Sequence, residues 1–301
     1  MLFSETQKGV LAIVLLSFGF GLFAVITRYL GESFTLFQQL YLTFGMGFVV
    51  SVFLFPYTLT PTRLRQIPLR DWKVILFRVV VGSILASILY RESLLIAKIS
   101  NVVFLQSLPF IAIFGWLLFK ERLTRQKVFF LTLSFVGVVV LSRPNDLTLN
   151  LGTGELLSII SGALFALAFL SRRWQTDFLN DKEMSQISLG ATAFGLFILS
   201  FFSADGVPAA IFDSKLFLVI ALSGMFLAGN TFFVNYGFRR VEPSLANNIL
   251  TLEAVFGTLL AYFFFGELPL PIELFGGILV ILAAIGMNRV ADHKGSFKQI
   301  K

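Results

Sequence analysis

The sequence predicts an all-α integral membrane protein built from two copies of one membrane unit. Of its 301 residues, 56% are hydrophobic and 14% are charged, and the mean hydropathy is +0.85. These values lie outside the range of ordinary soluble domains. A shift of 146 residues lays the segment 90–121 on the segment 236–267 without a gap. The coinciding pairs include Tyr90 with Tyr236, Asn101 with Asn247, Phe110 with Phe256, Phe119 with Phe265 and Glu121 with Glu267.

Ten apolar segments separated by short polar connections can be recognised along the chain. They cover residues 9–27, 35–56, 73–96, 99–119, 127–142, 153–171, 185–203, 215–237, 243–265 and 271–290. About 20 apolar residues cross a bilayer core at 1.5 Å per residue, so ten transmembrane helices are expected. The first segment leads straight into another span, and no small-residue cleavage site follows it, so a cleaved signal peptide is not expected.

Lys and Arg are distributed unevenly between the two sides of this arrangement. Eighteen of the 24 fall at the N-terminus, in the connections 57–73, 120–127, 172–182 and 239–240, and at the C-terminus. Five fall on the other side, and Arg78 lies inside the third span. Since cytoplasmic loops are enriched in these residues, both termini are predicted to be cytoplasmic in the cell (inner) membrane. The net charge of +7 is thus a topology signal and does not indicate a nucleic-acid partner.

An odd number of spans per repeat has a topological consequence. Five helices in residues 1–145 require the second copy, residues 146–301, to enter the membrane in the opposite orientation. Inverted repeats of this kind are common in secondary transporters, where a central cavity opens to either side in turn. Some channels share the arrangement, so the repeat favours transport without deciding it.

Several motifs occur at matching places in both halves. They are LLFKERL (117–123) with FFFGELP (263–269), and FVGVVVLSRP (135–144) with ELFGGILVILAAIGMNR (273–289). Two further motifs, LEAVF (252–256) and GTGELLSIISGALFALAF (152–169), lie in the second half alone. In these motifs the chain resembles the ten-helix EamA-type members of the drug/metabolite transporter superfamily. The resemblance implies two inverted five-helix repeats around a central cavity, and transport of small metabolites such as amino acids. The chain departs from the family where LFQQLYL (36–42) has no Arg and where Val255 replaces a frequent Pro.

Glu253 is the candidate residue on which the sequence places most weight. It lies near the middle of the ninth segment, where an ionised carboxylate is costly unless it faces water or a partner. On a helical wheel with Asn247 at zero, small and polar residues, including Thr251 and Glu253, occupy one arc. The opposite arc, predicted to face lipid, holds Leu252, Val255, Phe256, Leu259 and Phe263. Glu253 lies at the edge of the polar arc, which suits either a cavity wall or a helix–helix boundary.

The other candidates for substrate binding or coupling carry two interpretations each. Ser107 is the repeat equivalent of Glu253, and Gln106 lies beside it. Asn101, Asn247 and Asn230 can line a cavity or join helices by hydrogen bonds. Tyr90 can face the cavity, as the resemblance implies, or anchor the helix at the interface. Arg78 can snorkel to the interface or contact substrate.

Three further features of the sequence are expected to be structural. Arg91 lies near an interface and is expected to be an anchor or a gate charge. Glu121 and Glu267 end their helices and are expected to be corner residues. Pro109 lies within a span and is expected to kink it.

The favoured function is alternating-access transport, with export and proton coupling as open details. No Cys and a single His, His293, leave little for a metal or cofactor site. Glu253 is the only acidic residue expected near mid-membrane, so no catalytic pair of carboxylates is available there. An enzyme is therefore not expected. The expected partners are a small-molecule substrate, the lipid bilayer and protons. The alternatives are a membrane channel and a membrane-embedded lipid-modifying enzyme.

Overall fold

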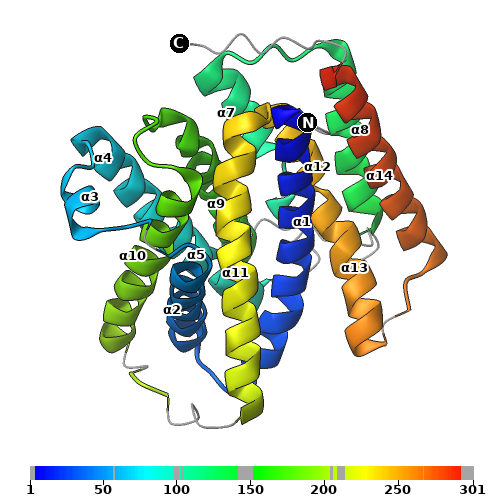
Figure 1. Cartoon of the computed structure of the whole chain (residues 1–301). Helices are drawn as coiled ribbons and strands as arrows, with labels where there is room; N and C mark the ends of the chain where they lie inside the picture. The colour runs from blue at the N-terminus through cyan, green and yellow to red at the C-terminus, as the bar shows by residue number, and fades with distance from the viewer. Residues whose placement is uncertain are drawn as a thin grey trace.

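The computed structural model of the 301-residue chain is a bundle of helices (Figure 1). It describes residues 4–56, 58–97, 102, 105–141, 152–203, 206–208, 214–266 and 268–292. The first half contributes α1 (Glu5–Leu30), α2 (Leu36–Leu54), α3 (Pro61–Arg65), α4 (Leu69–Phe77), the π-helix η1 (Arg78–Ala86), α5 (Ser87–Ile96), α7 (Phe110–Phe119) and α8 (Arg125–Leu141). The second half contributes α9 (Thr153–Leu170), the 3-10 helix η3 (Ser171–Trp174), α10 (Asp181–Phe202), α11 (Ser214–Arg240), α12 (Pro243–Leu250), α13 (Leu252–Phe265) and α14 (Pro271–Asp292). These described ranges contain no β-strand, which confirms the predicted all-helical class.

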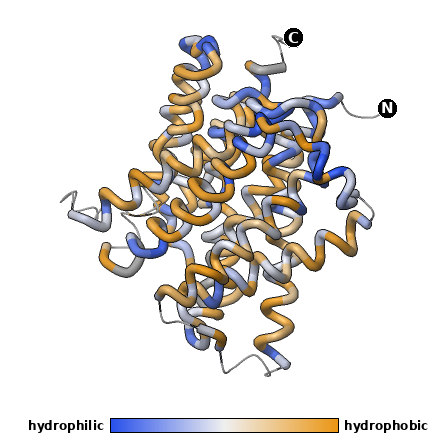
Figure 2. The backbone as a smooth tube through the Cα atoms, turned by 90° about the vertical axis from the view of Figure 1, so that its left-hand side faces the viewer, coloured by the Kyte–Doolittle hydropathy of each residue, from blue (hydrophilic) through white to orange (hydrophobic). Residues whose placement is uncertain are grey.

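Eight helices or continuous helical runs are long and apolar enough to cross a membrane. The other two expected segments contain α7, with 10 residues, and α8, with 17. Figure 2 shows hydrophobic residues along most of the helices and a gathering of hydrophilic segments at the end that carries the N-terminus. The protein is thus a multi-pass membrane protein, and the number of ten spans stays a prediction.

Capping residues explain where two of the long helices begin. At the start of α2 the hydroxyl of Thr35 accepts a hydrogen bond from the amide of Gln38, whose side chain accepts one from the amide of Thr35. Asn180 and Glu183 form the same reciprocal pair at the start of α10. Each pair satisfies amide groups that a helix leaves unpaired at its N-terminus, which fixes the first turn.

The two halves of the chain interdigitate. α1 packs against α11 and α13, α2 against α10 and α11, α5 against α9, and α8 against α14. Each of these contacts joins a helix of the first half to a helix of the second half. Neither half therefore buries its apolar helix faces without the other.

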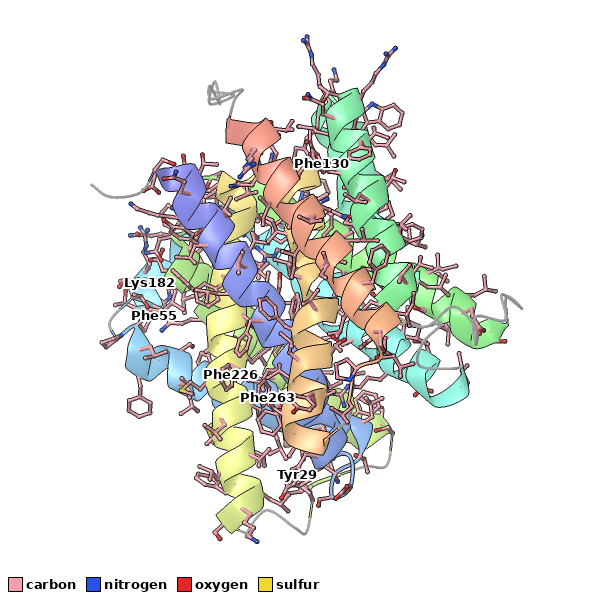
Figure 3. All side chains as sticks on the ribbon, turned by 90° about the vertical axis from the view of Figure 1, so that its right-hand side faces the viewer. Tyr29, Phe55, Phe130, Lys182, Phe226 and Phe263 are labelled. Carbon is pink, nitrogen blue, oxygen red and sulfur yellow. The ribbon has the colours of Figure 1, made fainter. Side chains whose placement is uncertain are left out.

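The packing of α8 against α14 depends on glycines and brings two repeat-equivalent helices together. A methyl group added to Gly137 would lie 2.9 Å from the carbonyl oxygen of Gly276, and one added to Gly286 would overlap the Phe130 ring (Figure 3). Phe130, near the start of α8, thus lies against Gly286 near the end of α14, whereas Gly137, further along α8, lies against Gly276. The two helices are antiparallel and approach closely, as glycines at membrane helix contacts allow.

The tight α8–α14 contact predicts a large effect of one added methyl group. In Gly276→Ala the new carbon would lie 2.5 Å from the Leu141 amide nitrogen and 2.7 Å from the Gly137 carbonyl oxygen. Such overpacking should lower the free energy of unfolding by ~1–3 kcal/mol, seen as a lower Tm of the detergent-solubilised protein. Gly45→Ala is the control, because nothing lies within 4 Å of its added methyl group. Equal Tm values for the two variants would contradict the contact.

A helix break occurs at the same place in each repeat. α12 ends and α13 begins around Thr251, where the amide of Ala254 donates to the carbonyl of Thr251 at 3.2 Å. At the positions 146 residues earlier, the amide of Leu108 donates to the carbonyl of Leu105 at 3.4 Å. α7 starts only after Pro109. Both fourth helices of the repeats are therefore interrupted, and the expected kink at Pro109 is a full break.

The outward-facing residues of α13 agree only in part with the helical-wheel prediction. Leu259 and Phe263 are 44% and 75% exposed, as the helical wheel predicts for a lipid-facing surface. Phe256 is not on that surface, because its ring packs edge-on against Phe18 of α1 at 5.5 Å. Phe256 and Phe263 lie two helical turns apart on one side of α13, and α1 packs against that side at Phe256.

Charged side chains join nearly all connections at one end of the bundle. Arg63 contacts Glu183 at 3.0 Å, Lys127 contacts Glu121 at 2.8 Å, and similar bonds continue between the neighbouring connections. We call this set the ionic layer and its end of the bundle the layer end. It comprises Glu5, Arg63, Arg70, Asp71, Glu121, Lys127, Arg172, Arg173, Thr176, Asp177, Asp181, Glu183, Arg239, Arg240 and Glu242. Every ion pair between two described residues lies at this end.

Glu121 has a structural role, as the sequence suggests, but the helix whose N-terminus it caps is not the expected one. Its carboxylate accepts hydrogen bonds from the amide and hydroxyl groups of Ser244, in the first turn of α12. A carboxylate at a helix N-terminus is favourable, because the unpaired amides and the helix dipole attract negative charge. The capped helix belongs to the other half of the chain and does not directly follow Glu121. Glu267, its repeat equivalent, lies outside the described residues.

The main apolar core lies on the inner side of the ionic layer. It includes Ile13, Leu170, Phe238 and Leu245, which are at most 1% exposed, and it draws on helices of both halves. Phe238 and Val241 also accept hydrogen bonds from Arg173 through their carbonyl groups. The layer end is therefore sealed by packed side chains as well as by ion pairs.

Candidate functional site

Glu253 lies at mid-depth in its membrane span. The span runs from Pro243 to Phe264, and Glu253 stands in the first turn of α13, directly after the break at Thr251. Its side chain is exposed, and its carboxylate interacts electrostatically with the Tyr90 hydroxyl. Tyr90 belongs to α5, which packs against α9, whereas α13 packs against α1. The carboxylate therefore lies near a helix of the other half.

A guanidinium group also lies near Tyr90. Arg91 interacts electrostatically with Tyr90, and its Nη1 donates to the side-chain oxygen of Gln39 at 2.8 Å. Its guanidinium carbon lies 6.0 Å from the centre of the Phe23 ring. The site thus combines a carboxylate, a phenol and a guanidinium from α13 and α5, with an amide from α2. Such a group can hold a molecule that carries both a positive and a negative charge.

Sequence reasoning did not place Arg91 or Gln39 in this site. Arg91 was expected to be an interface anchor or gate charge, and Gln39 lies in LFQQLYL, the segment without the expected Arg. The structure brings a guanidinium to that segment from α5 instead. The sequence signal that could have found it is the adjacency of Arg91 to Tyr90, a candidate already.

Two candidates from the first repeat have different positions from Glu253. The side-chain nitrogen of Gln106 donates to the carbonyl of Ser158 and the hydroxyl of Ser161 on α9, at 3.2 and 3.1 Å. Gln106 therefore joins helices. Ser107 is half-buried at the break before α7. Asn101 lies outside the described residues.

The remaining polar candidates of the second half are buried between helices. Asn247 and Thr251 are 6% and 8% exposed, and the Thr251 hydroxyl donates to the carbonyl of Asn248. Asn230 is 5% exposed on α11, and its amide group lies against Gly19 of α1. Asn248 donates to the carbonyl of Phe130 at 2.8 Å. These contacts fit the interpretation that small polar groups join helices in the membrane.

Arg78 does not snorkel to the surface. It is 7% exposed, at the first residue of η1, and its Nη1 is buried without a hydrogen-bond partner. An interfacial Arg78 side chain is expected only if the third span begins at residue 73. The helical run begins at Leu69 instead, which sets Arg78 deeper below the layer end.

Known proteins resemble this chain in sequence and in fold over nearly its whole length. The EamA-like transporter family matches residues 7–143 and 152–289, one match in each half. The chain belongs to the EamA-like transporter family. Proteins named "Uncharacterized transporter" from Helicobacter pylori strains ATCC 700392 / 26695 and J99 / ATCC 700824 are each 23% identical over 287 residues, which cover 92% of this chain and 92% of each relative.

A solved structure also has the fold of this EamA-like protein. It is described as "Crystal structure of protein" and superposes with a TM-score of 0.80 at 19% identity, over 96% of this chain and 99% of the other. Together with the family match, this makes the chain a membrane transporter with two EamA repeats, as the sequence motifs suggest. The likeness of fold carries no information on the transported molecule.

Proposed function

We propose that this EamA-like protein is a secondary transporter with ten transmembrane helices, arranged as two inverted five-helix repeats around a central cavity. The antiparallel packing of α8 and α14, which are equivalent under the 146-residue shift, supports the inversion. The matching helix breaks at residues 105–108 and 251–254 support it too. α8 is about 26 Å long at 1.5 Å per residue, close to the thickness of the hydrocarbon core.

The transported molecule is a small zwitterion of the amino-acid type. The observation that carries this proposal is that Glu253 and Arg91, of opposite charge, both lie close enough to Tyr90 to interact with it electrostatically. The carboxylate of Glu253 would bind an ammonium group, and the guanidinium of Arg91 would bind a carboxylate through paired N–H groups. Interrupted helices at matching places in the two halves are typical of substrate sites in transporters built from inverted repeats.

Transport proceeds by alternating access, with net export from the layer end to the opposite end. The ionic layer and the core below it close the layer end, while the Glu253 side chain, further along the bundle, is not enclosed by the protein. This arrangement fits the state that is open away from the layer. Burial disfavours the charged form of a carboxyl group, so Glu253 would bind a proton when substrate and water leave, which couples the cycle to protons.

Counterflow in proteoliposomes tests this function. Vesicles preloaded with an unlabelled mixture of the protein amino acids should take up a radiolabelled amino-acid mixture with saturable kinetics. Sugars, nucleotides, simple amines and simple carboxylates should compete weakly, because none of them carries both an ammonium group and a carboxylate. A channel would give no counterflow, and a lipid-modifying enzyme would give no uptake. Counterflow with sugars or nucleotides but not with amino acids would contradict the zwitterion site.

The proposed orientation predicts a labelling pattern. The chain has no Cys, so single-Cys variants can be labelled with a membrane-impermeant maleimide in intact cells. Thr62→Cys, on exposed α3 at the layer end, should react only after permeabilisation. Ser214→Cys, at the exposed start of α11, should react in intact cells. Labelling of Thr62→Cys from outside would contradict a cytoplasmic layer end and reverse the proposed orientation.

A further inference from the structure

A buried arginine without a hydrogen-bond partner lies beneath the ionic layer. The Arg78 side chain is 7% exposed, and its Nη1 has no partner. Within the described part of the chain, no hydrogen bond or ion pair involves its guanidinium group. An uncompensated charge in this setting is strongly destabilising. A bound anion at this point would compensate the charge of Arg78.

The charged neighbours of Arg78 leave a net positive charge. Arg78 interacts electrostatically with Arg172 and Asp181. The Asp181 carboxylate is already bound by Arg172 at 2.8 Å and by Arg240 at 2.9 Å. The Nε of Arg172 is a second buried donor without a partner. Two buried guanidinium groups thus share one buried carboxylate, and donors that suit an oxyanion remain unused.

The helix that packs against Arg78's own helix adds neutral polar groups. α10 contacts η1 and carries the hydroxyls of Ser188 and Thr192, which are buried without hydrogen-bond partners. Hydroxyls can accept or donate, so they suit the polar remainder of a small molecule. Unpartnered buried polar atoms on both helices are costly in a permanently closed interior.

Arg78 and Arg91 lie on one continuous helical run that contains the π-helix η1. Arg78 is its first residue, and Arg91 follows its last residue, Ala86, by five. The two arginines are 13 positions apart in the sequence, which separates them by at most roughly 20 Å along the helix. Arg91 belongs to the accessible site, whereas Arg78 is sealed below the ionic layer. One helix therefore presents a guanidinium group to each half of the transport path.

We propose that Arg78, assisted by the Nε of Arg172, forms a second binding site for the carboxylate of the substrate. This site fills when the layer end opens, and Arg91 holds the same carboxylate when the opposite end is open. The proposal rests on the proposed transport function and adds the inner half of the path. Both guanidinium groups would bind the carboxylate through paired N–H donors, which Lys cannot reproduce.

Transport from each side separately tests this site. Exchange of the radiolabelled amino-acid mixture is measured in right-side-out and inside-out membrane vesicles. Arg78→Gln should raise the half-saturation concentration about tenfold or more from the layer side, and change it by less than about twofold from the other side. Arg78→Lys should fall between these results. Arg65→Gln is the control, because Arg65 is an exposed residue of α3 outside the ionic layer. A symmetric change, or none, would overturn the proposal.

A binding measurement separates failure of this site from failure of the proposed function. Lys127→Met breaks the ionic layer and so opens the layer end. Sodium acetate should raise the Tm of this purified variant saturably above the value in sodium chloride at equal ionic strength. The rise should disappear in Lys127→Met/Arg78→Gln and persist in Lys127→Met/Arg65→Gln. No amino-acid exchange with an intact acetate effect would refute the substrate alone. An acetate effect that survives Arg78→Gln would refute the inner site.

Discussion

Glu253→Gln should abolish uphill transport driven by a pH gradient while leaving amino-acid exchange measurable. The amide keeps the size and hydrogen bonding of the side chain but cannot take up and release a proton. Glu253 is the accessible acidic group at mid-depth after the α12–α13 break, and its repeat equivalent is the uncharged Ser107. No second carboxylate at the matching break can therefore replace it.

Two measurements on the same proteoliposomes check this prediction. Uptake against a substrate gradient at an imposed pH difference should fall to the level of empty vesicles, while counterflow stays saturable. Glu183→Gln is an unsuitable comparison because Glu183 pairs with Arg63, so the exposed Glu32→Gln serves as the control if it keeps wild-type expression. Loss of exchange together with uphill transport would assign Glu253 to substrate binding alone. An unchanged pH profile would leave it only a structural role.

Lys127→Met should open the layer end of the bundle. Lys127 is 5% exposed and bridges Glu121 of its own half, at 2.8 Å, and Glu242 of the other half, at 2.5 Å. Removing the ammonium group leaves Glu121, which is 6% exposed, as a buried carboxylate without its cation. Breaking a buried pair in this way costs about 3–5 kcal/mol. Hydrating the carboxylates relieves this cost, and hydration requires the end to open.

Thiol accessibility reports this opening. Ala246→Cys places a thiol on α12 at a position that is 0% exposed, just inside the ionic layer. Its reaction with maleimide should be at least about tenfold faster in the Lys127→Met background. Val138→Cys, also 0% exposed but in the α8–α14 contact, should stay unreactive in both backgrounds. Reaction at both positions would indicate general unfolding, and reaction at neither would show that the ion pairs do not hold this end closed.

The fold class could be predicted from sequence because hydropathy and the 146-residue repeat depend only on the order of residues. The break before α7 was also visible in part, since Pro109 cannot continue a helix hydrogen-bond pattern. The break at Thr251 was not, because no Pro or Gly lies there and the turn is set by packing. The inward contact of Phe256 was not predictable either, because it depends on how α1 packs against α13.

The composition of the site was harder to predict than the presence of Glu253. Glu253 is conspicuous as a lone carboxylate in an apolar span, whereas Arg91 lies near a predicted helix end and has the sequence character of an interface charge. Its partner Gln39 is 52 residues away on another helix, and such pairings depend on tertiary packing. Lys127 and Arg172 likewise count as topology signals in the sequence, although both are buried in ion pairs.

The contact between α8 and α14 can form only late in biosynthesis. The two helices are equivalent under a shift of 146 residues, and α14 cannot cover Gly137 of α8 until it has left the ribosome. At 5–20 residues per second, this delay is about 7–30 s. During that time the first half resides in the membrane with its glycine surface open to lipid and to other proteins. A slow codon in the second half would lengthen this exposure.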